Sequence, residues 1–222
     1  PASAPAPTAA PAPADALTLE EKIGQLFIIR PDALDLTLPQ ETINDAKADG
    51  VTMLTDAMRE TLQAYPVGGI CQFGKNITDP EQLAQFNADL QAASRTPLFI
   101  AVDEEGGAVA RLANHPAFDL PQYESAAAVG ASGDPADACA MGQTIGAYLK
   151  EYGFNMDFAP DADVNTNPDN PIIGTRAFSS DAATAAEMAA AAAACAPAAS
   201  CRRSSISPAT VIPLRTATPR WP

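Results

Sequence analysis

The sequence predicts an α/β protein with a parallel sheet, because short apolar strands alternate along the chain with longer amphipathic helices. Strands are expected at Val67–Phe73, Pro97–Asp103 and Phe154–Ala159. The second of these is apolar on both faces, which is typical of a strand buried in a parallel sheet. An open doubly wound sheet and a (β/α)8 barrel both fit this order. No Gly-x-Gly-x-x-Gly follows the first strand, which disfavours a dinucleotide-binding fold.

Helices are predicted from capping signals and from apolar residues at helical spacing. Thr18 and Glu21 form a capping box, and the segment after it carries apolar residues at helical spacing (Leu19, Ile23, Leu26 and Phe27). Further helices are expected over Met53–Ala64, from Asp79-Pro80, over Asp134–Tyr152 and from about Asp181. Their predicted inner faces include Leu83, Phe86 and Leu90 in the helix after Asp79, and Met141, Ile145 and Leu149 in the helix after Asp134.

Composition excludes several classes of protein. The 222 residues are 47% hydrophobic, so the chain is not wholly disordered and can form a sizeable core. The formal charge of −14 argues against nucleic acid and against an anionic membrane surface as partners. No apolar run approaches the roughly 18–20 residues of a membrane span. One His and four scattered Cys do not form a familiar zinc cluster, and no metal or organic cofactor is implied.

Charge and composition divide the chain into three regions. Residues 1–16 contain five Pro, eight Ala and a single charge, Asp15, and form a predicted linker. Residues 17–194 form the acidic folded body. Residues 195–222 contain four Arg, five Pro, the only Trp and no acid, so the charge before residue 195 is 9 − 27 = −18. This tail differs from the body in composition and is expected to lie outside the domain.

Two features of the sequence, the predicted linker and the cysteines, are relevant to the cellular compartment in which the protein resides. Pro/Ala spacers often tether an exported domain to its signal or anchor, so we expect an extracellular or cell-envelope location, with a cytoplasmic location as the alternative. Cys71 lies in an apolar strand and Cys139 on a helix, and both are expected to be packed free thiols. The four cysteines do not settle the compartment.

Polar residues gather where the predicted strands end, which is where α/β folds place their chemistry. Asp103 ends an apolar strand, where a carboxylate has no packing role but suits two neighbouring sugar hydroxyls, since it only accepts hydrogen bonds. Arg111 and Arg176 are each able to donate paired hydrogen bonds to a ligand oxygen or a carboxylate. The alternative, at near even odds, is a structural ion-pair network of Asp103, Arg111 and Arg176.

Other polar residues in these loops are assigned lesser roles. Two further loops are candidate site loops because they follow predicted strands. They are residues 72–77 after the first strand and the Asp- and Asn-rich segment after the third. Asp157 and Asp163 are interpreted as loop-ordering caps rather than catalytic acids. Glu104 and Glu105 are as readily solvated as functional, and His115 is assigned no role.

Several long motifs in the chain resemble those of one enzyme family. They are the segments Leu17–Leu26, Gly68–Ile77, Phe99–Gly107, Gly153–Pro160 and Ile173–Asp181. Together they resemble the N-terminal domain of glycoside hydrolase family 3, and the nearest resemblance is to its β-N-acetylhexosaminidases. The resemblance covers about residues 17–194. It implies the N-terminal part of a (β/α)8 barrel, truncated after about three strands, and retaining hydrolysis that releases terminal β-linked N-acetylglucosamine from cell-wall or chitin-type glycans.

The resemblance also implies site residues. By position, Asp103, Arg111 and Arg176 match family residues that contact the sugar in the −1 subsite. Ala108 stands where many members have Arg, and Asp161 where an apolar residue is usual. The family's later Lys-His-Phe-Pro-Gly-His-Gly-Asp-Thr segment, its acid/base and its nucleophilic Asp are not found in this sequence. Because retaining hydrolysis requires both groups, no catalytic residue is retained and the chain as written is expected to be inactive.

The tail suggests why that segment is missing. The genetic code permits a nucleotide string for Ser204–Pro213 that, shifted by one nucleotide, encodes the missing family segment. We therefore hypothesise a change of reading frame near residue 194. The rival hypothesis is a true basic tail that docks to an acidic partner. The functional alternatives are an exo-β-glucosidase of the same family and a non-catalytic fragment, either sugar-binding or inert. An open half-barrel is also expected to be weakly stable or to associate.

Overall fold

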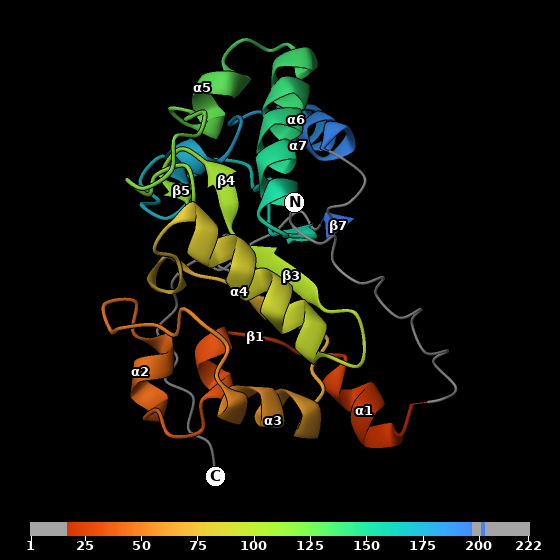
Figure 1. The fold of residues 1–222 in the computed structure, drawn as a ribbon. Helices are drawn as coiled ribbons and strands as arrows, with labels where there is room; N and C mark the ends of the chain where they lie inside the picture. The colour runs from red at the N-terminus through yellow and green to blue at the C-terminus, as the bar shows by residue number, and fades with distance from the viewer. Residues whose placement is uncertain (1–16, 197–200, 203–222) are drawn as a thin grey trace, which may run out of the picture.

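A five-stranded parallel sheet with helices packed on it organises the chain (Figure 1). The computed structural model describes residues 17–196 and 201–202. The strand order is β1-β2-β3-β6-β7, formed by Ile28–Ile29, Gly69–Cys71, Phe99–Val102, Met156–Asp157 and Cys201–Arg202. Each neighbouring pair is parallel, with Ile28 beside Gly69, Gly69 beside Phe99, Ala101 beside Met156 and Met156 beside Cys201. The predicted α/β class with a parallel sheet is confirmed, and within the described residues the sheet is open.

The helices connect successive strands as expected for repeated βα units. The longer ones are α3 (Asp56–Ala64), α4 (Pro80–Ala93), α6 (Pro135–Glu151) and α7 (Ala182–Cys195), and the shorter ones are α1 (Leu19–Gly24), α2 (Gln40–Asn44) and α5 (Ala126–Gly130). Short 3₁₀ turns occupy Pro31–Leu34, Gly74–Asn76 and Gly174–Arg176. Side chains cap most of the predicted starts, since Thr18, Asp79, Asp134 and Asp181 each accept a hydrogen bond from a backbone N–H in the first turn of the helix that follows.

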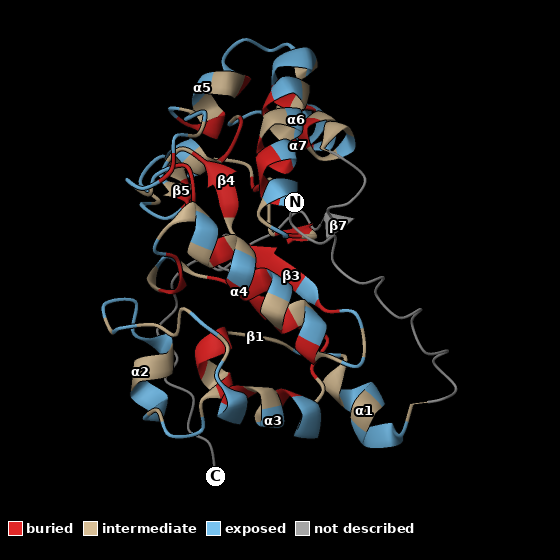
Figure 2. Cartoon of the chain, in the orientation of Figure 1, coloured by how far each residue is buried: buried red, intermediate tan, exposed pale blue. Residues whose placement is uncertain are grey.

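The two faces of the sheet are packed differently. Figure 2 shows that β3 is largely buried and that α4 and α6 each carry both buried and exposed residues. Ile70, Ile100 and Val102 point to the face covered by helices and join the main core. The residues that alternate with them, Cys71 and Ala101, form a smaller cluster with Met156 on the other face. The predicted inner faces of α4 and α6 are confirmed, because their apolar residues lie in the main core (Leu83, Phe86, Leu90, Met141, Ile145 and Leu149).

Several elements were not predicted. The two-residue strands β1 and β7 are too short to give a periodic signal, and β7 lies in the tail that was expected to fall outside the domain. A two-stranded antiparallel hairpin, β4 (Glu104–Gly106) with β5 (Val109–Ala110), follows β3. The hairpin turns at Gly106 and Gly107, where φ is +82° and +62°, and glycine adopts such angles without strain. Other predictions for the tail and the linker lie outside the described residues.

The apolar residues of the first helix are not buried, in contrast to the amphipathic pattern. Leu19 and Ile23 on α1, and Leu26 and Phe27 just after it, are all exposed, and Leu26 reaches 81%. Helical spacing predicts that these residues share a face of the helix. It does not predict whether another part of the same chain packs against that face. The free edge of β1 lies next to this segment.

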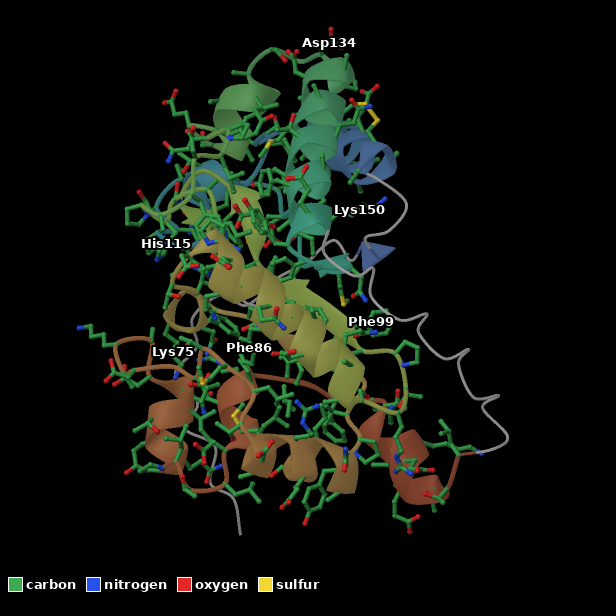
Figure 3. The ribbon with its side chains drawn as sticks, viewed as in Figure 1. Lys75, Phe86, Phe99, His115, Asp134 and Lys150 are labelled. Atoms are coloured by element: carbon green, nitrogen blue, oxygen red, sulfur yellow. A yellow bond between two sulfur atoms is a disulfide. The ribbon has the colours of Figure 1, made fainter. Side chains whose placement is uncertain are left out.

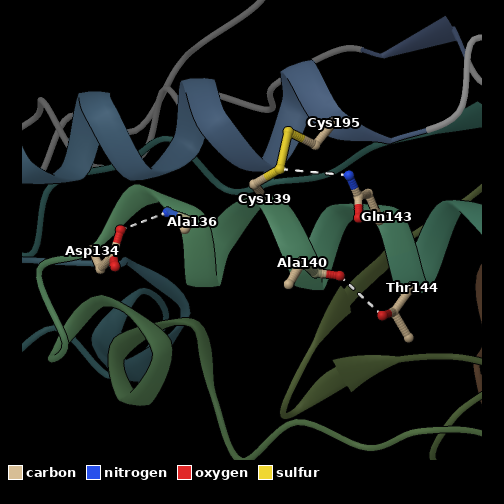
Figure 4. Close-up of a disulfide and its surroundings, with 7 residues drawn as sticks. All are labelled: Asp134, Ala136, Cys139, Ala140, Gln143, Thr144 and Cys195. Atoms are coloured by element: carbon tan, nitrogen blue, oxygen red, sulfur yellow. Dashed lines mark hydrogen bonds between the residues drawn. A yellow bond between two sulfur atoms is a disulfide. The ribbon is translucent and has the colours of Figure 1, made fainter.

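Helices α6 and α7 are joined by a disulfide, which corrects the expectation that Cys139 is a free packed thiol. Cys139 in α6 bonds to Cys195 at the end of α7, and Gln143 donates a hydrogen bond to the Cys139 sulfur at 3.7 Å (Figure 4). The helices approach closely at Gly142, where a Cβ atom would collide with the Ala192 carbonyl. Cys71 is a buried free thiol, as predicted, and burial raises its pKa to about 12. Among the described helices none has the length and apolar character to cross a membrane.

Candidate functional site

The candidate site lies at the carboxyl ends of the parallel strands. Arg30, Gln72, Asp103 and Asp157 stand at or directly after the ends of β1, β2, β3 and β6, and parallel strands bring these ends to one edge of the sheet. Gln72 faces the helix layer instead of the edge, because its Nε2 donates to Asn87 Oδ1 on α4 at 2.9 Å. Asp157 is buried and accepts the Glu104 backbone N–H, so of these four side chains Arg30 and Asp103 are the ones with surface left at this edge.

Asp103 and Arg111 lie together. Arg111 Nη2 donates to Asp103 Oδ2 at 3.2 Å, and the two side chains remain 32% and 26% exposed. The Arg111 Nε atom is buried and has no hydrogen-bond partner among the described residues. The pair is therefore open to solvent on one side and retains a guanidinium donor that is not used by a protein acceptor.

Arg176 is held by a different carboxylate. Its Nε and Nη2 atoms donate to the two oxygens of Glu105, both at 2.7 Å, and Nη2 lies 3.5 Å from Asp161 Oδ2. The hydrogen bonds to Glu105 raise the pKa of Arg176. The described contacts therefore form two separate groups of ion pairs, Asp103 with Arg111, and Arg176 with Glu105 and Asp161, rather than one network of the three predicted residues. Glu105 is buried, not solvated, since its carboxylate is fully engaged by this planar pairing.

Glu104 and Asp157 are buried next to each other, and the possibility that Glu104 is solvated is wrong. Glu104 has no exposed surface, and Asp157 Oδ1 accepts the Glu104 backbone N–H at 3.1 Å. Asp157 thus orders the start of the hairpin, which agrees with its interpretation as a cap. Burial raises the pKa of both carboxyl groups, well above the usual range for Asp157, and the negative charge of Glu104 adds to the effect on Asp157.

The loop over residues 72–77 contributes Lys75 to a buried ion pair that has a structural role. Lys75 Nζ lies 3.1 Å from Asp32 Oδ1, with side chains 4% and 0% exposed, and it donates to the carbonyls of Thr42 and Ile43 (Lys75 is labelled in Figure 3). Asn76 Nδ2 donates to Asp32 Oδ2 at 2.9 Å. This buried network ties the long connection after β1 to the end of β2.

Two features near the site were not found from the sequence. Arg30 places its guanidinium 4.0 Å from the centre of the Phe73 ring, within cation–π range, and donates to the Ile43 carbonyl. It was missed because β1 was not predicted, although Arg30 directly follows the apolar pair Ile28-Ile29. A small, largely apolar hollow of about 30 Å³ lies between α6 and α7. Glu104, Glu105 and Asp157 are in its lining, and Asp103, Arg111 and Arg176 lie outside it.

Among the described residues, His115 makes its hydrogen bonds and its ring contact within its own loop. His115 Nδ1 accepts the Ala117 N–H at 3.3 Å, and its ring packs edge-on against Phe118, which is a local structural role. Among residues 17–196 and 201–202, no group of three His, Cys, Asp or Glu side chains is arranged to hold a metal ion.

The raised carboxyl pKa values predict that stability falls as pH rises. Asp161 has its pKa raised to about 6, chiefly by burial, and Glu104 and Asp157 shift in the same direction. A carboxyl whose pKa is higher in the folded state stabilises the fold fully below its unfolded pKa, near 4, and this contribution is lost as pH rises through the folded value. We expect the free energy of unfolding to decrease by at least ~1 kcal/mol between pH 4 and 7, since each pKa unit corresponds to about 1.4 kcal/mol.

Urea titrations at a series of pH values measure this slope, and the Asp161→Asn variant is the matched control, expected to flatten it between pH 4 and 6. Four exposed acids have lowered pKa values and act in the opposite direction, but solvent screens them (Glu21, Asp35, Asp79 and Asp181). A stability that rises across this range, or a variant with the wild-type slope, would contradict the prediction.

Comparison with known proteins gives consistent matches. Residues 18–199 match the glycosyl hydrolase family 3 N terminal domain. Beta-hexosaminidase A of Pseudoalteromonas piscicida is 34% identical over 143 residues, and a beta-hexosaminidase of Stenotrophomonas maltophilia is 33% identical over 139 residues. These matches cover 62% and 61% of this chain but only 24% and 40% of the relatives, so the chain spans less than half of their length.

Solved structures show the same fold. A glycoside hydrolase family 3 beta-N-acetylglucosaminidase from Paenibacillus sp. superposes with a TM-score of 0.68 at 32% identity, over 84% of this chain and 32% of that one. Beta-N-acetylhexosaminidase from Beutenbergia cavernae gives a TM-score of 0.65 at 30% identity, over 84% of this chain and 52% of that one. The matches therefore cover about a third to a half of these longer chains.

Proposed function

Since the chain belongs to glycoside hydrolase family 3, we propose that it carries the sugar-recognising part of a β-N-acetylglucosaminidase site. The observation that carries the proposal is the half-exposed pair of Asp103 and Arg111 at the carboxyl end of β3. A carboxylate accepts hydrogen bonds from two adjacent sugar hydroxyls, and a guanidinium donates to a ring substituent or an acyl oxygen. Arg176, held rigid by Glu105, is the third proposed contact.

The type of sugar is proposed from the relatives. The proteins matched above are named as hexosaminidases and N-acetylglucosaminidases, which favours a terminal β-linked N-acetylglucosamine of a cell-wall or chitin-type glycan over the glucose of an exo-β-glucosidase. Asp103 and Arg111 recognise hydroxyls, which both sugars have, so these two residues do not by themselves distinguish the substrates.

We propose that this chain binds sugar without cleaving it. Retaining hydrolysis needs a nucleophile and a proton donor on opposite sides of the glycosidic bond. The described carboxylates closest in sequence to Asp103 are already engaged, Glu104 by backbone N–H groups and Glu105 by Arg176. The family's Lys-His-Phe-Pro-Gly-His-Gly-Asp-Thr segment is not encoded in frame in the 222 residues. Binding alone, without groups that act in the transition state, gives no such chemistry.

An oxidising compartment is proposed for the protein, either extracellular or in the cell envelope. In the chain as given, the Cys139–Cys195 disulfide would persist in such a compartment, because disulfides are rare in reducing cytoplasm. The Pro/Ala-rich composition of residues 1–16 is consistent with a spacer between an export signal or anchor and the domain.

A chromogenic N-acetylglucosaminide assay tests the proposal that catalysis is absent. The chain as given is expected to show no turnover above a buffer blank, whereas the gene with its frame restored near codon 194 is expected to show clear turnover. The chromogenic glucoside serves as the matched substrate and should be cleaved more slowly by the restored protein. Release of the chromophore by the chain as given, abolished in its Asp103→Ala variant, would overturn this part of the proposal.

A further inference from the structure

The three consecutive acids at the end of β3 have three different environments, and the middle one is not used by the proposed sugar site. Asp103 is partly exposed beside Arg111, Glu105 is paired with Arg176, and Glu104 is completely buried. A buried carboxylate is costly unless its oxygens are well satisfied. The partners that satisfy Glu104 therefore indicate what the residue is for.

The carboxylate of Glu104 holds the loop after β5 by accepting hydrogen bonds from the backbone N–H groups of that loop. Its Oε2 accepts the Leu112 N–H at 2.9 Å, its Oε1 accepts the Ala113 N–H at 2.9 Å, and Oε1 also accepts the Tyr148 hydroxyl from α6 at 2.9 Å. All three donors are uncharged, and two of them belong to successive residues of one loop. The carboxylate thus anchors this loop to α6 and to the start of the hairpin.

The anchored loop carries Arg111. Leu112 follows Arg111 directly, and the side chains of Leu112 and Ala113 are buried, so the backbone at this point has little freedom. Among the described residues the guanidinium has one hydrogen bond to a carboxylate, that of Asp103 at 3.2 Å, and otherwise lies 6.0 Å from the centre of the Phe73 ring. A long side chain with one such contact depends on its backbone for position, and the backbone depends on Glu104.

We propose that Glu104, oriented by Tyr148, is a positioning residue that keeps the Arg111 guanidinium beside Asp103 in the sugar site. This rests on the proposed function for its consequence in sugar binding. The anchoring itself is a property of the free protein. Glutamine is not an equivalent substitute, because its NH₂ group would face one of the two backbone N–H donors in place of an acceptor oxygen.

The charges around Glu104 give the anchor a pH dependence. Asp103 and Glu105 flank it in sequence, Asp157 approaches from β6, Tyr148 faces it from α6 with Tyr123 nearby, and Arg111 lies on the anchored loop. Burial raises the pKa of Glu104, so protonation begins at a higher pH than for an exposed Glu. Because the pKa of Glu104 is higher in the anchored state than in an opened state with a solvated carboxyl, the anchor is favoured at low pH and weakens as pH rises through that pKa.

Backbone hydrogen exchange, followed by NMR on the whole chain, tests the proposal without sugar. Glu104→Gln is expected to lower the protection factors of the Leu112 and Ala113 amides about tenfold or more and to shift the Arg111 side-chain N–H signal, while Ile100 and Val102 in β3 keep their protection. Tyr148→Phe is expected to give a smaller change of the same kind. Glu151→Gln, an exposed acid at the end of α6, is the matched control and should change nothing.

The pH profile separates positioning from a general loss of structure. In the wild type, the protection factors of Leu112 and Ala113 should fall as pH is raised through the pKa of Glu104, and in Glu104→Gln they should not depend on pH. Unchanged protection in Glu104→Gln, or a pH profile that the variant shares, would overturn the proposal. If Glu104→Gln does not fold, Tyr148→Phe and the wild-type pH profile decide it by the same criteria.

Calorimetry with N-acetylglucosamine keeps the two proposals distinguishable. The affinity of Glu104→Gln is expected to be about tenfold lower than that of the wild type. Equal affinity would overturn the positioning role and leave the proposed function standing. A wild type that binds no sugar would remove the proposed function, and the exchange data would still decide whether Glu104 holds Arg111 in place.

Discussion

Removal of the Cys139–Cys195 disulfide is expected to lower the free energy of unfolding by about 4 kcal/mol, because its loop spans 56 residues. The bond restricts the unfolded chain, so its loss increases the entropy of that state. In the folded state the bond joins α6 and α7, whose close approach at Gly142 leaves no room for adjustment. An effect of this size is a large fraction of the stability of a typical domain.

Urea denaturation with and without a reductant measures this effect. The Cys139→Ser/Cys195→Ser double variant is the matched control, expected to have the stability of the reduced wild type and no further response to reductant. Cys71 is buried in the sheet and has no part in the bond. A reductant effect that persists in the double variant, or a wild type that is indifferent to reductant, would show that the disulfide does not stabilise the fold as described.

Replacement of Lys75 by Met is expected to destabilise the protein by about 3–5 kcal/mol, the usual consequence of leaving one member of a buried ion pair without its partner. Lys75 and Asp32 are almost completely buried. The lysine uses its three N–H donors on Asp32 and on two carbonyls of the connection after β1. The variant therefore leaves a buried carboxylate uncompensated and frees that connection from the sheet.

Thermal and urea unfolding measure this loss, and Lys47→Met in the same connection is the control. Lys47 is exposed, and its replacement is expected to change the free energy of unfolding by less than about 0.5 kcal/mol. The double variant Asp32→Asn/Lys75→Met should be more stable than Lys75→Met alone, because the uncompensated charge is gone. A double variant that loses the sum of the two single effects would argue against direct coupling of the pair.

Local sequence signals were sufficient for the longer elements. Thr18, Asp79 and Asp181 each supply a side-chain cap within the first turn, so the helix starts are encoded by a few adjacent residues. The apolar run that ends at Asp103 is long enough to indicate a buried strand. By contrast, Ile28–Ile29 is a strand only because Gly69 and Ile70 lie beside it, and no local pattern contains that information.

The contacts of the site depended on residues far apart in sequence, and this limited the prediction. The end of β3 was identified as a site because a carboxylate at the end of an apolar strand has no role in packing. The hydrogen-bond partners of the neighbouring acids could not be identified from the sequence, since Arg176 lies 71 residues from Glu105 and Tyr148 lies 44 residues from Glu104. Adjacent acids in a loop look alike in sequence, and only the fold decides which of them is buried. The disulfide was missed for the same reason.

We propose that Asp103 and Arg111, which lie together at the carboxyl end of β3, bind sugar as a pair. Calorimetric titration of the whole chain with N-acetylglucosamine tests it most directly, with Asp103→Ala as the variant and Asp119→Ala, an exposed acid on a neighbouring loop, as the control. We expect millimolar affinity in the wild type and in Asp119→Ala, and no measurable binding in Asp103→Ala. No heat of binding in the wild type, or the same affinity in Asp103→Ala, would contradict it.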